Sequence, residues 1–187
     1  KKAKALIIDV RENGGGSTEV AWLIQSHLTK SKYFLNFGYE TRINNGVRKA
    51  NGNWIDEYKD FFLNKATEYC KPDTVFISDS IYRIKVPTAI LIGRYTFSAA
   101  EDLLINLYEV PDRPVFIGEY TGGSTGSPLV IFDADGNVSA RLCTRRVSFP
   151  YSRKPFINNG IKPDIIIKDN IDNFLKNKDE VLDTAIK

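Results

Sequence analysis

Three short apolar runs divide this chain, and each is bounded by charged or small residues, as buried strands usually are. The first run is followed by a glycine loop and the second by the turn of residues 94–97, and apolar positions at helical spacing come after each. Such repeated strand–helix units predict a mostly parallel sheet, because each helix returns the chain to the same edge. The predicted strands cover residues 5–10, 87–93 and 114–118, and the two helices cover residues 18–29 and 98–108.

The other segments predict an antiparallel portion and a helical C-terminus. Residues 33–54 alternate aromatic and polar side chains and predict two or three strands, with turns at Asn44-Asn45-Gly46 and Asn51-Gly52. Further expectations are a helix over residues 56–70, a hairpin of residues 129–132 and 138–149 around a turn at 133–136, a short strand over 163–167 and a terminal helix over 170–186. These patterns together predict one α/β domain over residues 1–187, with a mostly parallel sheet and added hairpins.

Composition narrows the class of protein. The 187 residues suffice for one substantial core, and 42% hydrophobic with 26% charged residues is ordinary for a globular domain. The net charge is +3 with both signs interspersed. No nucleic-acid partner is expected, because nucleic-acid faces concentrate Lys and Arg. No membrane span is expected either, because no apolar stretch approaches about 20 residues.

Two features of the chain leave wider questions open. The sequence begins Lys1-Lys2-Ala3-Lys4 and contains no methionine, so we interpret it as a fragment of a longer protein whose N-terminal region is absent. Catalytic groups can then lie upstream. Cys70 and Cys143 can pair or stay free, and the redox compartment stays open.

Candidate chemistry follows the first two helix-bearing strands. Gly14-Gly15-Gly16 comes after the first strand and Ser98 after the second. Ligands of such folds bind at the carboxyl ends of the strands, so we expect the glycine loop and Ser98 to meet there. Ser98 would lie at a helix N-terminus, where the N–H of Ala99 and its neighbours are free to bind negative charge.

Both features also have plainer interpretations. Serine is a common helix N-cap, and glycines at a helix entry supply unusual backbone angles. Phosphate binding is another alternative, but the loop lacks the Gly-Lys-Ser/Thr ending of a P-loop and the spaced G-x-G-x-x-G of a dinucleotide fold. The sharper interpretation is acyl transfer, in which side-chain-free residues let a substrate carbonyl approach backbone N–H groups.

Four motifs resemble those of the C-terminal-processing and tricorn-core serine peptidases, in that family's order and spacing. Residues 9–16 are similar to the Asp-Leu-Arg-x-Asn-x-Gly-Gly signature, and residues 97–101 resemble the Ser-Ala-x-Glu nucleophile motif. Residues 117–123 resemble the Gly-Glu-x-Thr-x-Gly loop, and residues 159–164 the Gly-Ile/Val-x-Pro-Asp close. Each motif alone is moderately specific, whereas four in register over most of the chain are a strong signal.

The resemblance implies a ClpP/crotonase-like core, a spiral of ββα units, and hydrolysis of peptide bonds through an acyl-enzyme. Ser98 would be the nucleophile. The N–H of Ala99 and a glycine N–H of the first loop, Gly15 before Gly16, would hold the oxyanion. No metal and no organic cofactor is implied.

One position departs from the family pattern. The C-terminal-processing branch has a lysine base where this chain has Ser124, and a serine cannot act as that base. The chain therefore resembles the tricorn-like branch more closely, in which the base is a histidine upstream of the first motif. We interpret the single histidine, His27, as a structural residue of the first helix.

Several polar residues keep two interpretations. Glu101 is a favourable charge near a helix N-terminus or an acid that orients the base. The tricorn-like branch also carries a glutamate before its Gly-x-x-Pro-Asp motif, but residues 156–159 contain no carboxylate. Ser124 and Thr125 line a substrate cleft or form a solvated turn. The predicted hairpin also carries Arg141, Arg145 and Arg146, with Phe149 and Tyr151 beside them. These residues form a solvated strand face, or a basic and aromatic wall whose arginines bind a peptide's C-terminal carboxylate.

We therefore predict the core of a serine endopeptidase that acts on peptides or proteins and is nearly inactive without an upstream histidine. The resemblance implies a bacterial, exported protein, periplasmic or on the cell surface, with an N-terminal or PDZ-like domain as partner. The first alternative is a non-catalytic relative that binds peptides or small apolar ligands. The second is an acyl-CoA enzyme of the crotonase type, against which Ser98 and Pro163-Asp164 argue.

Overall fold

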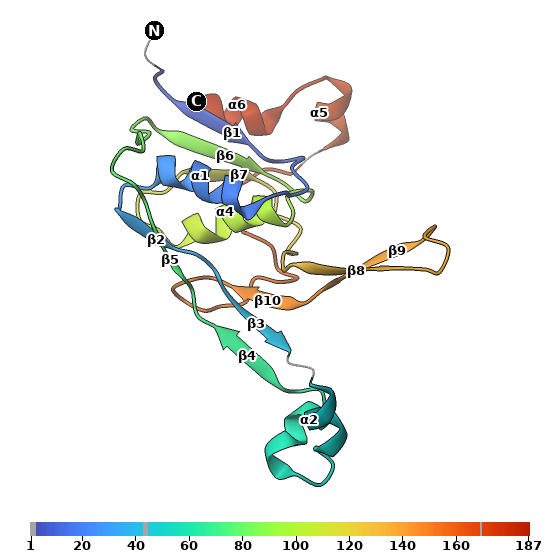
Figure 1. The fold of residues 1–187 in the computed structure, drawn as a ribbon. Helices are drawn as coiled ribbons and strands as arrows, with labels where there is room; N and C mark the ends of the chain where they lie inside the picture. Colours follow the sequence, from blue (N-terminus) through green and yellow to red (C-terminus); the bar gives the residue numbers. More distant parts are fainter. Residues whose placement is uncertain (1–2, 43–44, 169) are drawn as a thin grey trace.

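A parallel four-stranded sheet forms the centre of the computed structural model, which describes residues 3–42, 45–168 and 170–187 (Figure 1). Its strands lie in the order β1 (Leu6–Asp9), β6 (Thr88–Ile92), β7 (Val115–Gly118) and β11 (Ile165–Ile166). Every neighbouring pair is parallel. The predicted buried strands and the parallel sheet are therefore confirmed.

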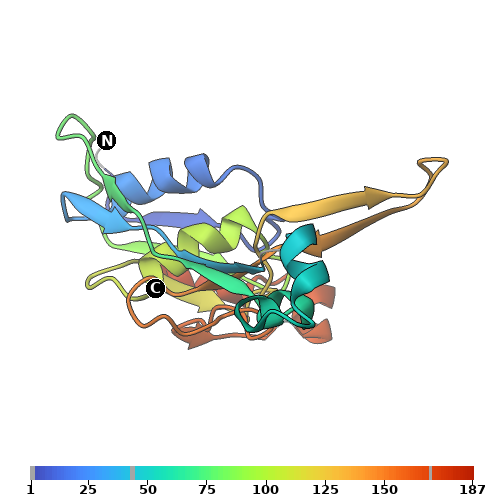
Figure 2. The ribbon, with the colours of Figure 1, turned by 60° about the horizontal axis from the view of Figure 1, so that its bottom comes forward.

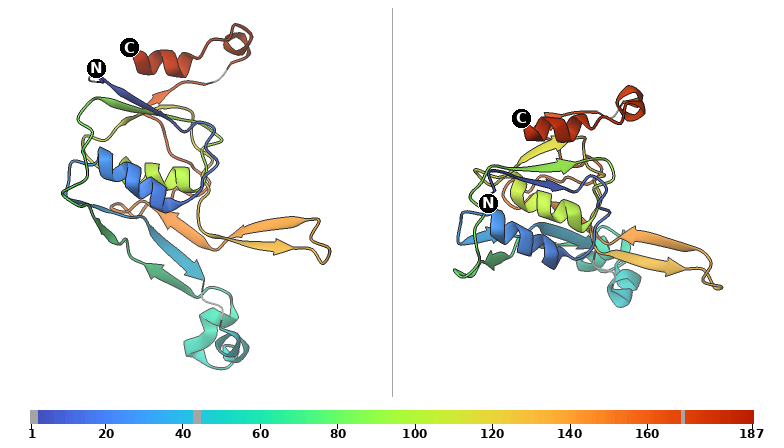
Figure 3. Two further views of the ribbon diagram at one scale, coloured as in Figure 1. Left: turned by 45° about the horizontal axis from the view of Figure 1, so that its top comes forward. Right: turned by 90° about the horizontal axis from the view of Figure 1, so that it is seen from above.

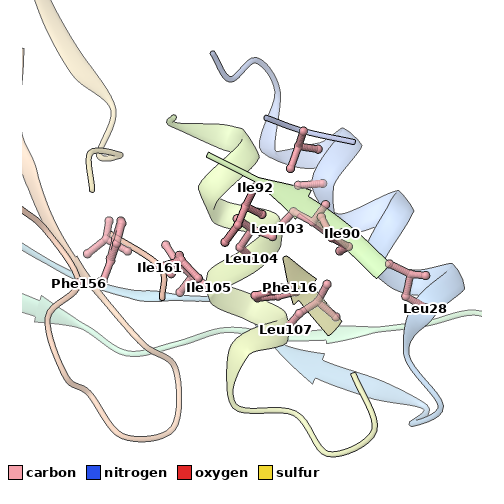
Figure 4. Packing of buried hydrophobic residues seen from close by; sticks show 13 residues of the cluster. Leu28, Ile90, Ile92, Leu103, Leu104, Ile105, Leu107, Phe116, Phe156 and Ile161 are labelled. Carbon is pink, nitrogen blue, oxygen red and sulfur yellow. The ribbon is translucent and has the colours of Figure 1, made fainter. Parts of the chain in front are cut away.

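Helices cover both faces of this sheet. α1 (Thr18–Leu28) and α4 (Ala99–Tyr108) pack together on one face, and α6 (Glu180–Ile186) contacts β6 and β7 from the other (Figure 3). Ile90 and Phe116 belong to the larger apolar cluster on the α1–α4 side, shown in Figure 4. Leu91 packs with Val181 of α6 on the opposite side. Coverage on both faces explains why these strands are continuous apolar runs in the sequence.

An antiparallel layer lies beyond α4. β3 (Gly38–Arg42) pairs with β10 (Arg145–Ser148) on one edge and with β4 (Thr67–Cys70) on the other. A second ribbon joins β2 (Tyr33–Leu35) to β5 (Thr74–Phe76). β3 and β4 lead away from the body to a helical tip formed by α2 (Gly46–Asn51), a 3-10 turn (Asp56–Tyr58) and α3 (Lys59–Phe62) (Figure 1).

A two-stranded hairpin projects from the body on its own (Figure 2). It consists of β8 (Pro128–Phe132) and β9 (Ser139–Cys143), and every residue of both strands is exposed. The predicted hairpin is confirmed, but its second strand ends at Cys143 instead of continuing to residue 149. The N–H of Thr144 donates to the carbonyl of Gly126, after which the chain leaves to form β10 on another sheet.

Two predictions for residues 33–70 are wrong in part. Residues 46–51 form a helix instead of strand and turn, because the side chain of Asn45 caps it by accepting from the N–H of Arg48; Asn44 lies outside the described residues. The helix expected over 56–70 ends at Phe62, and Thr67–Cys70 pairs with β3 instead.

The terminal helix expected over residues 170–186 is interrupted. It forms α5 (Ile171–Leu175) and α6, separated where Asn177 has a φ of 51°. A left-handed residue cannot continue a helix, and asparagine tolerates that conformation better than most residues. Across the described ranges, no helix is long and apolar enough to cross a bilayer. Cys70 and Cys143 are both free thiols.

Candidate active site

The glycine loop and Ser98 meet at the carboxyl ends of β1 and β6. A Cβ atom placed on Gly15 would lie 2.6 Å from the Cβ of Ser98 and 3.1 Å from its hydroxyl oxygen. Gly15 also has a φ of 111°, which side chains rarely allow. A glycine is therefore required at position 15 for the loop to approach the serine this closely.

Ser98 occupies a strained turn between β6 and α4. Its φ is 54° and its ψ is −127°, and its side chain does not cap the helix. Two bonds hold the turn: the N–H of Ser98 donates to the carbonyl of Ser124 at 3.0 Å, and that of Phe97 donates to Asn13 at 3.1 Å. Within the described part of the chain the Ser98 hydroxyl has no hydrogen-bond partner. A strained, unpartnered serine is typical of a functional site rather than of an ordinary helix cap.

Backbone N–H groups beside Ser98 are available to an anion. Among the described residues, the amides of Ala99 and Gly16 have no acceptor, whereas the N–H of Gly15 donates to the Asn13 side chain at 2.9 Å. An oxyanion bound by Gly15 would have to displace that bond. The preference for Gly15 over Gly16 stays a prediction, and this geometry favours Gly16.

Two cavities border the Ser98–Ala99 junction. The larger, of about 530 Å³, extends from Ser98 past the Ser124–Gly126 loop to the base of the β8–β9 hairpin. The smaller, of about 230 Å³, lies between α1 and α4 beside Gly15, Gly16 and Ala99. Its further lining is mostly apolar, with Val20, Ala21, Ile24 and Leu103 among the apolar residues and Asn13 and Ser17 as the polar ones. We call the larger cavity the Ser98 cleft.

Glu101 fixes the loop that carries Ser124. Its carboxylate is fully buried and accepts from the Thr121 hydroxyl, from the N–H of Gly123 at 2.7 Å and from the N–H of Ser124 at 2.8 Å. Burial raises the pKa of Glu101, and these three donors lower it in part. Its bonds therefore orient backbone groups, and the suggestion that it orients a base stays a prediction.

The neighbouring Asp102 was not singled out from the sequence. Its carboxylate is also buried and accepts from the hydroxyl of Thr18 at 2.6 Å and from that of Thr125 at 2.9 Å. Burial raises the pKa of Asp102, against the lowering effect of the two hydroxyls. Thr18 begins the helix after the glycine loop, so Asp102 ties both loops of the site to α4. The sequence signal that could have identified Asp102 is a second carboxylate directly after Glu101, at the start of an otherwise apolar helix.

Neither of the two base types that the resemblance implies lines the Ser98 cleft among the described residues. The lining includes Glu12, Arg141 and Cys143 but no lysine and no histidine. Ser124 stands where the resemblance implies a lysine in the C-terminal-processing branch, and its hydroxyl oxygen lies 3.8 Å from the Cys143 sulfur. His27 is at the far end of α1 from Thr18, where its Nδ1 lies 2.7 Å from the carbonyl of Tyr82. In the described ranges, no group of three or more His, Cys, Asp or Glu is arranged to hold a metal ion.

Known structures share the overall fold of this chain. A crystallised protein of Parabacteroides merdae ATCC 43184, proposed to be a peptidase, is 25% identical with a TM-score of 0.74, over 98% of this chain and 51% of that one. The tricorn protease is 18% identical with a TM-score of 0.61, over 98% of this chain and 14% of the other. The photosystem II D1 C-terminal processing protease is 19% identical with a TM-score of 0.56, over 89% of this chain and 35% of that one.

These likenesses show a mixed α/β fold with a ClpP/crotonase-like core, as the motifs implied. The chain spans about half, or less, of the length of these relatives. No curated protein matches it in sequence. The sequence signature of peptidase family S41, however, matches residues 1–167, which is most of the chain. This chain therefore belongs to peptidase family S41.

Proposed function

We propose that this chain is the core of a serine endopeptidase in which Ser98 attacks the peptide bond. The observation that carries the proposal is the strained, unpartnered Ser98 packed against Gly15, with the free N–H of Ala99 next to it. Acyl transfer requires a nucleophile and an oxyanion donor within reach of one carbonyl group, and this turn supplies both.

The reaction follows from these groups. The Ser98 oxygen adds to the scissile carbonyl carbon and its proton passes to a general base. The N–H groups of Ala99 and Gly16 stabilise the oxyanion. The carbon–nitrogen bond then breaks, the base returns its proton to the leaving amine, and water hydrolyses the serine ester. Glu101 and Asp102 hold the two loops in the positions that this sequence of steps needs.

The base of this reaction is a histidine supplied from outside residues 1–187, upstream in the same protein. Two observations support an external base. The described lining of the Ser98 cleft has neither lysine nor histidine, and Ser124 stands where the resemblance implies the lysine of the C-terminal-processing branch. An exported protein with an N-terminal or PDZ-like domain that presents the substrate completes the proposal, and it rests on the resemblance alone.

Labelling with a fluorophosphonate, which reacts with activated serines, tests the proposal. The full-length parent should be labelled, its Ser98→Ala variant should not, and the exposed-site control Ser152→Ala should be labelled like the parent. The 187-residue chain should label far more slowly, because it lacks the base. A folded parent that resists labelling contradicts the proposal.

A non-catalytic relative that binds peptides is the second candidate. It is favoured by the cleft without a base and by residues 156–159, which lack the glutamate of the tricorn-like branch. In that case the Ser98→Ala parent binds peptides as tightly as the unmodified parent, and neither hydrolyses them.

A further inference from the structure

The β8–β9 hairpin has two different faces. Successive strand residues point to opposite sides, and residues directly opposite in register share a side. Pro128 pairs with Cys143, and Val130 with Arg141. One side therefore comprises Pro128, Val130, Phe132, Ser139, Arg141 and Cys143, and the other comprises Leu129, Ile131, Ala140 and Leu142. We call these the cleft face and the outer face.

The cleft face continues the wall of the Ser98 cleft. Pro128, Arg141 and Cys143 line that cleft together with Ser98, whereas no residue of the outer face does. Val130 and Phe132 extend the same face outward and are 40% and 64% exposed. A chain that leaves the cleft along the hairpin thus meets apolar side chains without a change of direction.

Arg141 adds a charge to this surface. It is exposed, and none of the ion pairs among the described residues involves it. Arg141 lies opposite Val130 in register and lines the cleft, so it is next to the apolar residues that continue the cleft face. An unpaired guanidinium beside apolar side chains favours a carboxylate, which it binds through two parallel hydrogen bonds.

We propose that the cleft face binds the part of a substrate polypeptide that extends beyond the scissile bond, and that it selects apolar segments with an acidic group facing Arg141. The inference rests on the proposed function, because it takes the Ser98 cleft as the path of the substrate. It adds the substrate class: extended chains that carry apolar residues and a side-chain or C-terminal carboxylate.

The geometry also sets a length requirement. β8 has five residues, and an extended chain advances about 3.3 Å per residue. A peptide must therefore continue for about five residues beyond the cleft to cover Val130 and Phe132. Short peptides reach the cleft only and gain nothing from Val130 and Phe132.

Binding to the Ser98→Ala form of the chain tests this without any hydrolysis. The probes are fluorescein-labelled peptides of about twelve residues with apolar residues toward the C-terminus, ending in a free carboxylate or in a carboxamide, and a truncated six-residue form. Fluorescence anisotropy gives their dissociation constants. Val130→Ser and Phe132→Ser should each weaken the long carboxylate peptide about tenfold. Leu129→Ser and Ile131→Ser are matched controls from the outer face and should stay within about twofold.

With Arg141 in place, we expect the long carboxylate peptide to bind about tenfold more tightly than the carboxamide peptide. Arg141→Gln should abolish this preference and leave the binding of the carboxamide peptide unchanged. The truncated peptide should bind the Val130, Phe132, Leu129 and Ile131 variants alike, because none of these residues lines the cleft. Equal losses from both faces, or a carboxylate preference that survives Arg141→Gln, overturn the inference. Fluorophosphonate labelling of the parent tests the proposed function separately. If the parent is labelled but substitutions on the two faces weaken peptide binding equally, the docking surface is wrong and the serine peptidase stands. If only the cleft-face substitutions weaken binding and the parent is not labelled, the serine peptidase is wrong and the docking surface stands.

Discussion

The first turn of α4 and the β8–β9 hairpin reverse the usual distribution of polar and apolar residues. Glu101 and Asp102 are 0% and 3% exposed, whereas Phe132 and Leu129 are 64% and 55% exposed. In these two regions burial therefore follows the availability of partners rather than polarity. The carboxylates are inside because donors surround them, and the apolar hairpin is outside because none of the described residues covers it.

The two regions differ accordingly in what they contribute. Buried carboxylates with complete hydrogen bonding fix the backbone around them, and the removal of one partner leaves the others unsatisfied. Exposed apolar side chains contribute little to the stability of the isolated chain but offer area to a ligand. The α4 turn is expected to determine stability and site geometry, and the hairpin to determine binding.

Among the changes at the α4 turn and the hairpin, Glu101→Gln should produce the largest loss of stability. The side-chain amide presents two N–H donors where three donors already converge, so it cannot replace the carboxylate around Thr121, Gly123 and Ser124. We expect a loss of about 2–4 kcal/mol in the free energy of unfolding, measured by urea titration. Glu57→Gln makes the same chemical change at an exposed position and should change little. Equal values for the two variants would show that the buried network carries no stability.

Gly15→Ala should come next. The new Cβ would lie 2.6 Å from that of Ser98, and the positive φ disfavours any side chain. We expect a loss of about 1–3 kcal/mol, together with slower fluorophosphonate labelling of the parent protein. Gly14→Ala is the matched control one residue away, because its Cβ would meet nothing within 4 Å. Similar labelling of both variants would mean that the close approach to Ser98 has no role in its reactivity.

The pH dependence of stability separates buried from exposed carboxylates. The pKa of Asp102 is raised by burial from the ordinary value of 3.8, so the folded chain binds its proton more tightly than the unfolded chain does. Its favourable contribution is complete below that value and declines as the pH rises through the raised pKa. The pKa of Asp164 is lowered from 3.8, first by its hydrogen bonds from Arg113. Its contribution is complete above 3.8 and declines as the pH falls.

The two variants Asp102→Asn and Asp164→Asn should therefore show opposite trends. The destabilisation by Asp102→Asn should be larger at about pH 4 than at about pH 7, and that by Asp164→Asn should be larger at about pH 7. Urea titrations of the three proteins at both values give the comparison. Parallel trends would mean that burial does not dominate the titration of Asp102.

The sequence predicted the parts of this fold that depend on local pattern. The strands before the glycine loop and before Ser98 are apolar runs of the length of a strand. Because ligands of parallel sheets bind at the carboxyl ends of the strands, the sequence also predicted that Gly15 and Ser98 lie close together. The same local reasoning failed at Thr67–Cys70, whose helical spacing was overridden by pairing with β3. Three of the four residues of this strand are exposed, so it lacks the alternation of apolar and polar side chains that identifies a half-buried strand.

The carboxylate network was hidden for a related reason. Asp102 finds its partners at Thr18 and Thr125, which are 84 and 23 positions away. The packing of α1 against α4 brings Thr18 to Asp102, and Thr125 reaches Asp102 from the loop between β7 and β8. Glu101 was noticed because it belongs to a motif, but only the structure shows that it holds the loop of Ser124.

The smallest effect on stability is expected at the hairpin. Phe132→Ser removes a large side chain that is 64% exposed, so the free energy of unfolding should change by no more than about 0.5 kcal/mol. Phe116→Ala, in the fully buried core, is the contrasting variant and should lose about 3–5 kcal/mol. A loss at position 132 approaching that at 116 would mean that the hairpin packs against the body in solution. A small loss, combined with weaker peptide binding by the same variant, would separate the two regions: a buried turn that determines stability, and an exposed hairpin whose apolar residues act only when a ligand covers them.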